Sequence, residues 1–395
     1  MRNDSFLTQV RNRLFTRHRV YTDTRAYNRS SSSASFWGRW AQRILLVVNL
    51  LVGLLYLASA YSPYVSPTEH PVWSCLGLAF PLLLLLHSSF FVLWLLFRPR
   101  MLWMPAVFLA LAWDTTTTSC SIGSPIEHPE GSTFKLLTYN THMRVFSGLD
   151  HPEKNEMLNY LKDSGADILC LQEFIPPTEK AARIVNRYLS NYPYHHQYRM
   201  VKGNGLGLYS RYPILSVEPV RYTTRFANGS VVYRLLVGTD TLLVVNNHLE
   251  TNQISDYDKE VYQDLLKGKK ENSRTGSKHL LKKLAQATAV RGPQADSVAQ
   301  AIRRSGQQYV VACGDFNDSP VSYAHRVIGE GLDDAFAEAG WGLGTTYNQS
   351  YMYFRIDHIL VSPSLRVVQC EVDRSIRLSD HYPMWCILEK PSKDE

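Results

Sequence analysis

The fold is decided by the stretch YVVACGDFN, residues 309–317. Its first five residues form a continuous apolar run, which is typical of a β-strand buried on both faces. Gly314 and Asp315 follow directly, so a carboxylate stands where the strand ends. Asn317 lies two residues further on, and on an extended chain its side chain shares one face with that of Asp315. The stretch therefore predicts a central strand that delivers an acid and an amide to the edge of a sheet.

The same pattern of an apolar run followed by polar residues recurs between residues 134 and 388. Each polar residue taken alone fits an ordinary turn or surface position. Side chains at strand ends can leave a sheet and converge, so together they predict one polar cleft. The motifs are LTYN at 137–140, LQE at 171–173, NNH at 246–248, GDFN at 314–317, RIDH at 355–358 and SDH at 379–381.

In this order the six motifs resemble the endonuclease/exonuclease/phosphatase family, in which a metal-binding Glu follows an apolar strand ending in Gln-Glu. The resemblance covers residues 134–388. It implies an α/β fold, a DNase I-like four-layer sandwich of two mixed β-sheets flanked by helices, preceded here by N-terminal transmembrane helices. It also implies a metal-dependent phosphoric ester hydrolase.

Phosphodiester hydrolysis needs a hard cation, a positioned water, stabilisation of the developing negative charge and a proton for the leaving oxygen. We expect Glu173, Asn140 and Asp380 to be the metal ligands. Mg²⁺ is the expected ion, with Mn²⁺ as a substitute, because Mg²⁺ prefers oxygen ligands and keeps several waters. Asn140 and Asn317 are expected to bind the substrate phosphate.

The expected catalytic residues are two acids and two histidines. Asp315 would orient the attacking water, and His381 would contact the phosphate in the transition state. The resemblance implies that His248 protonates or stabilises the leaving group and that Asp357 fixes its tautomer. Asp380 is expected either to hold His381 or to join the metal site.

The N-terminal third has the composition of a membrane protein. Residues 44–62 are apolar and free of charge, close to the roughly 20 residues that span a bilayer. A second apolar stretch covers 72–97 and a third covers 101–113, with Arg98-Pro99-Arg100 between them. The third stretch is short and also suits a buried or interfacial helix. Two or three transmembrane helices are therefore expected within residues 44–113.

The charge distribution predicts the topology. Nine arginines and two aspartates give residues 1–43 a charge of +7, the formal net charge of the whole chain. This is typical of a cytoplasmic leader, and it means that the pI of about 9.0 says little about what the C-terminal part binds. Three spans would place that part outside the cytoplasm and two would leave it inside. The basic turn at 98–100 favours three, with the domain on the extracytoplasmic side of the inner or plasma membrane.

The expected organisation is a leader at 1–43, transmembrane helices at 44–113, a linker at 114–132 and the family domain at 133–390. Strands are expected at residues 135–139, 168–172, 205–210, 230–237, 242–247, 309–314, 356–362 and 384–388. Helices are expected at residues 154–164, 179–188, 260–284 with a break, and 295–304.

One segment of the domain is basic: residues 256–304 carry eleven Lys and Arg against six Asp and Glu. This is either a solvated helical pair or an electropositive rim that steers an anionic substrate. Arg291 and Gln294 within it resemble an Arg-x-x-Gln feature that recurs near the family's cleft.

The six cysteines show no C-x-x-C spacing, so neither a zinc site nor a disulfide framework is indicated. Cys170 and Cys313 lie inside apolar runs, where a free cysteine behaves as a small hydrophobic residue.

The function that the sequence favours is a membrane-anchored, Mg²⁺-dependent phosphoesterase that hydrolyses a phosphodiester by metal-assisted in-line attack of water. The partners expected are the bilayer and a substrate that is either a nucleic acid or a phospholipid headgroup, because the family's site serves several substrates. No protein partner is indicated. The alternative is a catalytically idle, membrane-tethered binding or sensing module, against which the intact Glu173, Asp315, Asn317 and His381 argue.

Overall fold

The computed structural model describes residues 30–200, 204–226, 228–267, 273–349 and 352–391. The chain divides into two compact units, residues 1–51 and 52–395. The second unit contains every strand and the cleft described below.

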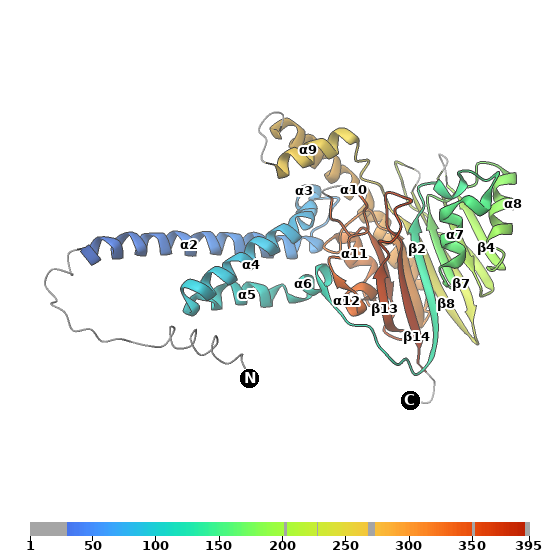
Figure 1. Ribbon diagram of the computed structural model, residues 1–395, viewed down its shortest axis with the longest axis horizontal. Helices are drawn as coiled ribbons and strands as arrows, with labels where there is room; N and C mark the ends of the chain where they lie inside the picture. The colour runs from blue at the N-terminus through green and yellow to red at the C-terminus, as the bar shows by residue number, and fades with distance from the viewer. Residues whose placement is uncertain (1–29, 201–203, 227, 268–272, 350–351, 392–395) are drawn as a thin grey trace, which may run out of the picture. The chain divides into compact units, whose positions relative to one another are not determined.

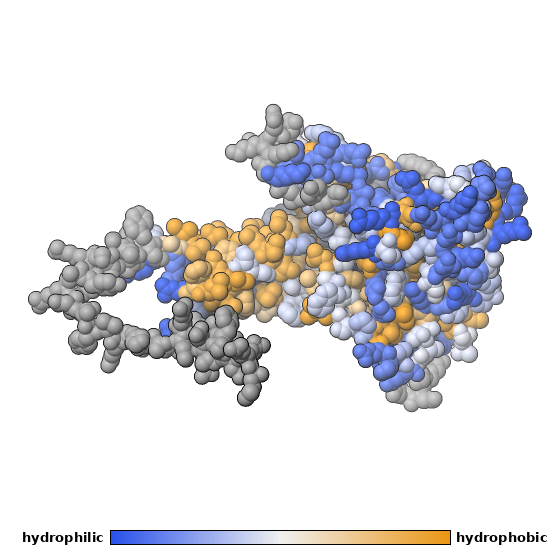
Figure 2. Space-filling view, in the orientation of Figure 1, coloured by the Kyte–Doolittle hydropathy of each residue, from blue (hydrophilic) through white to orange (hydrophobic). Residues whose placement is uncertain are grey.

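Two N-terminal segments are long and apolar enough to cross a bilayer, namely Arg39–Ala60 and Pro71–Phe97. The first lies in helix α2 (Ser30–Ala60) and the second ends with α4 (Phe80–Phe97). A shorter apolar helical segment, Pro99–Leu111, includes α5 (Trp103–Leu111). Figure 2 shows apolar residues gathered over α4 and α5, whereas the face of the sheet domain is mostly hydrophilic. The Thr-rich stretch that follows α5 forms helix α6 (Trp113–Ser119) at the start of the expected linker.

Two six-stranded sheets form the centre of the second unit. One has the order β13-β14-β2-β3-β5-β4 and the other β10-β12-β9-β8-β7-β6. Both are mixed, because β2 pairs with β3 and β8 with β9 in parallel while the other neighbours are antiparallel. The first sheet contains β2 (Ser132–Asn140), β3 (Ile168–Gln172), β4 (Tyr194–Arg199), β5 (Gly205–Ser210), β13 (Arg366–Val372) and β14 (Met384–Lys390). The second contains β6 (Ile214–Pro219), β7 (Gly229–Val237), β8 (Asp240–His248), β9 (Tyr309–Asp315), β10 (Asp333–Asp334) and β12 (Asp357–Val361). A short ribbon pairs β1 (Ser121–Ile122) with β11 (Trp341–Gly342).

Helices cover the outer face of each sheet, which makes four layers (Figure 1). Apolar side chains of both sheets, among them Leu136 and Val311, share one core between the sheets. Helices α7 (Glu156–Asp163) and α8 (Glu179–Tyr188) pack on the first sheet, and α10 (Ser273–Ser305) and α11 (Tyr323–Ile328) pack on the second. The predicted α/β sandwich of two mixed sheets flanked by helices is confirmed.

Two helical features differ from the prediction. The segments 260–284 and 295–304 were expected as separate helices, but α9 (Asp256–Leu266) is followed by one continuous α10 that runs through Pro293. Proline removes one backbone donor, and the long contact of α10 with α3 (Pro71–Ser74) and α11 stabilises the helix on both sides of it. Gly292 permits this packing, because a Cβ there would lie 2.4 Å from Pro67 Cγ. Helices α6, α11 and α12 (Ala335–Ala339) and the edge strands β4, β6, β10 and β13 were not predicted.

A buried polar contact joins the two sheets beneath the cleft. The Gln172 amide donates to Asn246 Oδ1 at 2.7 Å and to Thr138 Oγ1 at 3.0 Å. The Asn246 amide donates in turn to the carbonyls of Gly207 at 3.1 Å and Leu171 at 3.3 Å. Both residues are fully buried, so their amides depend on each other and on these backbone groups. The contact fixes the ends of β3 and β8 relative to each other.

We expect Asn246→Ala to lower the free energy of unfolding by about 1–3 kcal/mol, because it removes three buried hydrogen bonds, one from the Gln172 amide and two to the carbonyls of Leu171 and Gly207. Denaturant unfolding of the detergent-solubilised chain measures this. Gln172→Met combined with Asn246→Leu should cost less than the sum of the single changes, since the buried polar groups then leave together. Strictly additive effects would show that the two amides do not act as a pair.

Candidate active site

A cavity of about 800 Å³ lies where the carboxyl ends of both parallel strand pairs meet. Asn140 ends β2, Glu173 follows β3, and His248 and Asp315 end β8 and β9. Parallel neighbours end at the same edge of a sheet, and the stacked sheets bring the two edges together. Six of the predicted site residues line this cavity: Glu173, His248, Asp315, Asn317, Asp380 and His381.

Asp315 is at the centre of the site. Its Oδ2 accepts a hydrogen bond from the Asn140 amide at 3.0 Å and lies 3.6 Å from His248 Nε2 and 3.7 Å from His381 Nε2. Its Oδ1 accepts the backbone N–H of Asn317 at 2.8 Å. One carboxylate thus contacts residues from two strand ends and two loops, and it is almost completely buried.

Asp357 is paired with His381. Its Oδ2 lies 2.8 Å from His381 Nδ1, and the two side chains are almost completely buried. The prediction that Asp357 fixes the tautomer of His248 is therefore wrong. Asp357 opens β12 opposite Asp315 in β9, and this antiparallel register directs it to the loop that carries His381. Two roles were considered for Asp380, holding His381 or joining the metal site. Asp357, and not Asp380, holds His381.

His248 has a different partner. The Asn204 amide Nδ2 lies 3.4 Å from His248 Nδ1. An amide nitrogen only donates, so Nδ1 accepts and the proton of the neutral ring is on Nε2. That nitrogen lies 3.6 Å from Asp315 Oδ2 and 4.0 Å from Glu173 Oε1. The ring therefore presents a proton to the interior of the cavity.

Glu173 and Asp380 face each other across a histidine. His142 Nδ1 lies 3.3 Å from Glu173 Oε2 and 3.4 Å from Asp380 Oδ1. Glu173 Oε1 also accepts from the Asn140 amide at 3.3 Å. Two carboxylates thus converge on one position that a nitrogen atom fills.

Asn317 is held close to Asp315 by its backbone. Its side-chain amide donates to the Leu249 carbonyl at 3.1 Å, and its own carbonyl accepts from the Asn252 amide at 2.7 Å. The extended strand end expected here is replaced by a left-handed residue, with φ of 54° at Asn317. The turn returns its backbone N–H to Asp315.

Unfavourable backbone geometry is concentrated around this cavity. In the described part of the chain, the non-glycine residues with positive φ are His142, Met143, Glu173, Gln253 and Asn317. Four of them line the cavity and Met143 is next to one of these. Such conformations cost about 1–3 kcal/mol each and persist where the surrounding structure imposes them, which is common at functional sites.

Burial and neighbouring charges shift the pKa values of three ionisable groups of the site. Burial raises the pKa of Glu173, but the His142 hydrogen bond and the nearby His248 outweigh it and hold the pKa at about 2. Burial lowers the pKa of His381, but Asp357 and Asp315 outweigh it and raise the pKa to about 10. Burial and the neighbouring Asp357 raise the pKa of Asp315, although His381 opposes them. The site thus combines a Glu whose pKa is lowered, a His whose pKa is raised and a buried Asp whose pKa is raised.

Arg291 and Gln294 support the loops of the site from behind. Arg291 donates to Asp318 Oδ2 at 3.0 Å and to the Glu250 carbonyl at 2.6 Å. The Gln294 carbonyl oxygen accepts the Glu250 backbone N–H at 2.8 Å. Both residues are buried and neither lines the cavity, so they anchor the loops after β8 and β9.

A second buried cluster near the site is structural. Asp334 Oδ2 lies 2.8 Å from His325 Nε2, and its Oδ1 accepts from Arg355 at 2.9 Å. His358 Nε2 lies 2.9 Å from the Asp318 carbonyl. Burial raises the pKa of Asp334, but Arg355 and His325 hold it well below its usual range. With both carboxylate oxygens engaged, this cluster ties α11, β10 and β12 together.

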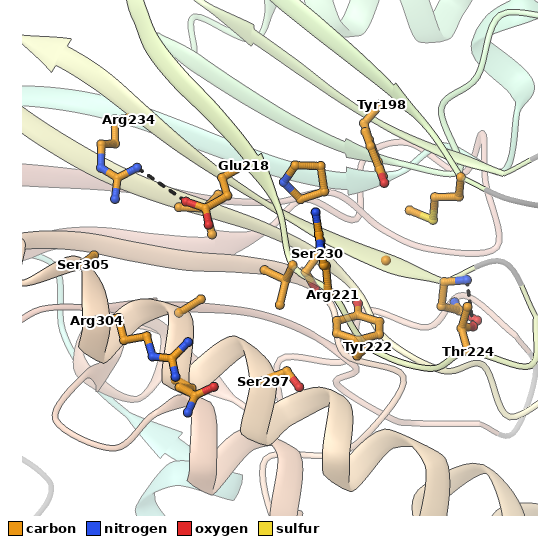
Figure 3. Close-up of a pocket in the computed structure, with 18 residues that line it drawn as sticks. Tyr198, Glu218, Arg221, Tyr222, Thr224, Ser230, Arg234, Ser297, Arg304 and Ser305 are labelled. Atoms are coloured by element: carbon orange, nitrogen blue, oxygen red, sulfur yellow. Dashed lines mark hydrogen bonds and ion pairs between the residues drawn. The ribbon is translucent and has the colours of Figure 1, made fainter.

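Another cavity, of about 860 Å³, lies away from these residues, between β6, β7 and α10. Figure 3 shows Arg221, Arg234 and Arg304 around it, with Glu218 facing Arg234 at 3.9 Å. None of the predicted site residues lines it.

Sequence reasoning missed three residues of the site. His142 follows Asn140 by two positions, a spacing that could have indicated a shared face. Asn204 precedes β5 within a glycine-rich stretch whose glycines are explained by close packing, since a Cβ on Gly207 would lie 2.6 Å from the Phe174 ring. Tyr347 packs edge-on against His381 with ring centroids 5.5 Å apart, and no motif marks it.

Comparison with known proteins gives two family matches. Residues 137–381 match the Endonuclease/Exonuclease/phosphatase family. Residues 42–119 match a family described as a domain of unknown function, DUF8431. A search of curated protein sequences gave no match.

Several solved structures are similar in fold to part of this chain. A humanized D. rerio TDP2 with 14 mutations is 16% identical, covers 65% of this chain and 99% of its own, and has a TM-score of 0.49. An endonuclease/exonuclease/phosphatase family protein from Bacteroides thetaiotaomicron is 17% identical, with 67% and 100% coverage and a TM-score of 0.47. D. rerio TDP2 complexed with a single-strand DNA product is 16% identical, with 66% and 100% coverage and a TM-score of 0.46.

The family match covers more than half of the 395 residues and includes all six strand-end motifs. As those motifs predicted, the protein belongs to the endonuclease/exonuclease/phosphatase family and is a phosphoric ester hydrolase.

Proposed function

We propose that this protein is a membrane-anchored, Mg²⁺-dependent phosphodiesterase whose catalytic domain lies on the extracytoplasmic side. The observation that carries the chemical part is the convergence of Asn140, His248 and His381 on the single carboxylate of Asp315. Attack of water on a phosphoester needs a group that orients the water and groups that donate protons or hydrogen bonds. The Asp315 carboxylate, the two imidazoles and the Asn140 amide can serve these purposes.

The residues around Glu173 fit a divalent cation. Glu173 and Asp380 offer hard carboxylate oxygens, and one or two carboxylates suffice for Mg²⁺. Asn140 turns its amide nitrogen to Glu173, and its Oδ1 accepts the His142 backbone N–H. The two carboxylates converge on His142, so a cationic or donor atom is already accommodated between them. The low pKa of Glu173 keeps it ionised as a ligand must be. When bound, the ion would polarise the phosphoryl oxygen and stabilise its growing negative charge.

The chain's own residues would supply the other steps. Asp315 would accept a hydrogen bond from the attacking water and orient it, with Asn140 and the Asn317 N–H fixing the carboxylate. His381, held protonated by Asp357, would donate Nε2–H to a phosphate oxygen. His248 would deliver its Nε2 proton to the leaving oxygen, while Asn204 fixes its tautomer. The Asn317 amide would bind the phosphate, whereas the Asn140 amide donates to Glu173 and Asp315.

Contacts between the catalytic domain and the segment that follows α2 support an extracytoplasmic position of the domain. Arg326 of the catalytic domain donates to the Pro63 carbonyl at 2.8 Å, and Gly77 packs directly on Val321. Both Pro63 and Gly77 belong to the region between the start of η1 (Ser62–Tyr64) and the start of α4. A chain whose leader is cytoplasmic would carry that region to the far side after its first crossing.

The return of the chain supports a third crossing. After α4 the chain turns at residues 98–100, and α5 and α6 lead back toward the end of α2. The Tyr56 hydroxyl lies 2.5 Å from Thr116 Oγ1, and Thr115 Oγ1 lies 3.5 Å from the Ala60 carbonyl. Because α6 lies beside Ala60, the short third stretch would bring the catalytic domain back to the side where α2 ends.

We expect Asp315→Asn to reduce Mg²⁺-dependent hydrolysis of bis(4-nitrophenyl) phosphate by about 100-fold or more, since it removes the base that orients water. EDTA should abolish the wild-type rate and Mn²⁺ should restore it. Asp163→Asn, an exposed carboxylate of α7, is the matched control and should keep full activity. Equal rates in the two variants would reject the role of Asp315.

The pH profile should shift in Asp357→Asn. The folded-state pKa of His381 is raised to about 10, so its proton is held below that value and is lost as pH rises through it. Removing the Asp357 charge should lower this pKa toward the ordinary value of about 6.5, and the alkaline limb of kcat/KM should move to lower pH. Profiles of both proteins at one fixed Mg²⁺ concentration measure the shift. An unchanged alkaline limb would contradict the pairing of Asp357 with His381.

The topology can be read from cysteine labelling of intact expressing cells. Lys180→Cys, exposed on α8, should react with a membrane-impermeant maleimide without permeabilisation. Asp4→Cys in the leader should react only after permeabilisation, and the unmodified chain gives the background. Labelling of the leader but not of α8 in intact cells would place the catalytic domain in the cytoplasm and end the extracytoplasmic proposal.

A further inference from the structure

The cavity that contains the site is lined by both polar catalytic residues and apolar side chains. Glu173, Asp315 and His381 form the polar end. Residues from segments 251–255 and 347–356 also line the cavity, and six leucines come from two regions far apart in sequence. These leucines form an apolar wall and are Leu78, Leu82, Leu265, Leu280, Leu281 and Leu284. Leu78 and Leu82 belong to η2 (Cys75–Ala79) and α4, and the other four to α9 and α10.

The apolar wall is continuous with a candidate membrane span. Leu82 lies in the first turn of α4, within the segment Pro71–Phe97, and is 63% exposed. Figure 2 shows the apolar surface that continues along α4. A molecule lying against Leu82 would therefore reach the catalytic end of the cavity without leaving apolar surroundings.

The neighbouring face of α10 has the composition of a membrane-interface helix. Helix α3 lies beside α10 (Figure 1), and between them is a shallow groove of about 390 Å³. Val72 and Leu281 give it exposed apolar surface, and Lys278 and Lys282 lie at its side. Exposed apolar residues interleaved with lysines are typical of segments that rest at the boundary of a bilayer.

The wall of the site cavity is unsuited to a nucleic acid. Nucleic-acid grooves neutralise successive phosphates with lysine and arginine. Among the described residues, neither a lysine nor an arginine lines this cavity. The basic residues Lys282 and Lys283 line a separate cavity on the other side of Thr251, Asn252 and Gln253.

We infer that the substrate is a lipid phosphodiester that enters from the bilayer, with its phosphate at the polar end of the cavity and its hydrocarbon chain along Leu82, Leu265 and Leu281. This inference rests on the proposed function. Water adds to phosphorus, the bond from phosphorus to one ester oxygen breaks, and that oxygen leaves with a proton as an alcohol, giving a phosphomonoester. Each methylene that moves from water to the apolar wall strengthens binding.

The test compares two probes with the same leaving group, 4-nitrophenyl ethyl phosphate and 4-nitrophenyl hexadecyl phosphate, on the full chain in dodecyl maltoside micelles. The wild type should show a kcat/KM for the hexadecyl ester at least about tenfold above that for the ethyl ester. Leu281→Glu and Leu265→Glu should each lower this ratio by about tenfold, because each places a charge on the chain-binding wall. Both positions are about two-fifths exposed, 41% and 40%, so a Glu side chain is tolerated by the fold.

Tyr257→Glu is the matched control, since Tyr257 is 54% exposed on α9 but does not line the cavity. It should leave the ratio unchanged. A hexadecyl preference that survives both leucine substitutions would reflect partition into micelles, and equal rates for the two probes in the wild type would also overturn the lipid assignment. Failure of the wild type to hydrolyse either probe, or hydrolysis that persists in Asp315→Asn, would instead overturn the proposed function.

Discussion

The site depends on the placement of one imidazole between two buried carboxylates. Asp357 holds His381 Nδ1 at 2.8 Å, and His381 Nε2 lies 3.7 Å from Asp315. Two carboxylates at this depth repel each other and lose their hydration, so the structure requires a cation between them. The protonated His381 meets that requirement, and the same proton is then available to a phosphate. His381 therefore both stabilises the buried carboxylates and can donate a proton to the substrate.

The two-sheet architecture explains why these groups meet. Asp315 and Asp357 are direct neighbours in register on β9 and β12, whereas Asn140 and Glu173 come from the other sheet. The buried Gln172 and Asn246 amides connect the sheets just below. A shift between the sheets would separate Asn140 from Asp315, so the packing of the core also sets the geometry of the catalytic groups.

Much of this could be predicted from the sequence, because continuous apolar runs such as 309–313 identify buried strands and the polar residues after them identify the cleft. The pairing of His381 with Asp357 could not be predicted from the sequence. The two residues are 24 positions apart, and the antiparallel register of β12 on β9 determines where Asp357 lies. Edge strands such as β4 have mostly exposed or half-buried residues and lack an apolar run. His142, Asn204 and Tyr347 lie in turns and loops, where contacts are set by tertiary packing. The apolar wall around Leu281 was also not predicted, because segment 256–304 is rich in charged residues and its composition gives no indication that its leucines line a cavity.

The central claim is that Glu173 and Asp380 form a divalent-cation site, and binding itself tests it without reference to turnover. Isothermal titration of Mn²⁺ into the detergent-solubilised full chain should give saturable binding in the wild type. Glu173→Gln should weaken it by about tenfold or more, since the neutral amide removes a charged ligand while keeping its shape. Undiminished Mn²⁺ affinity in Glu173→Gln would contradict the account and place the cation elsewhere.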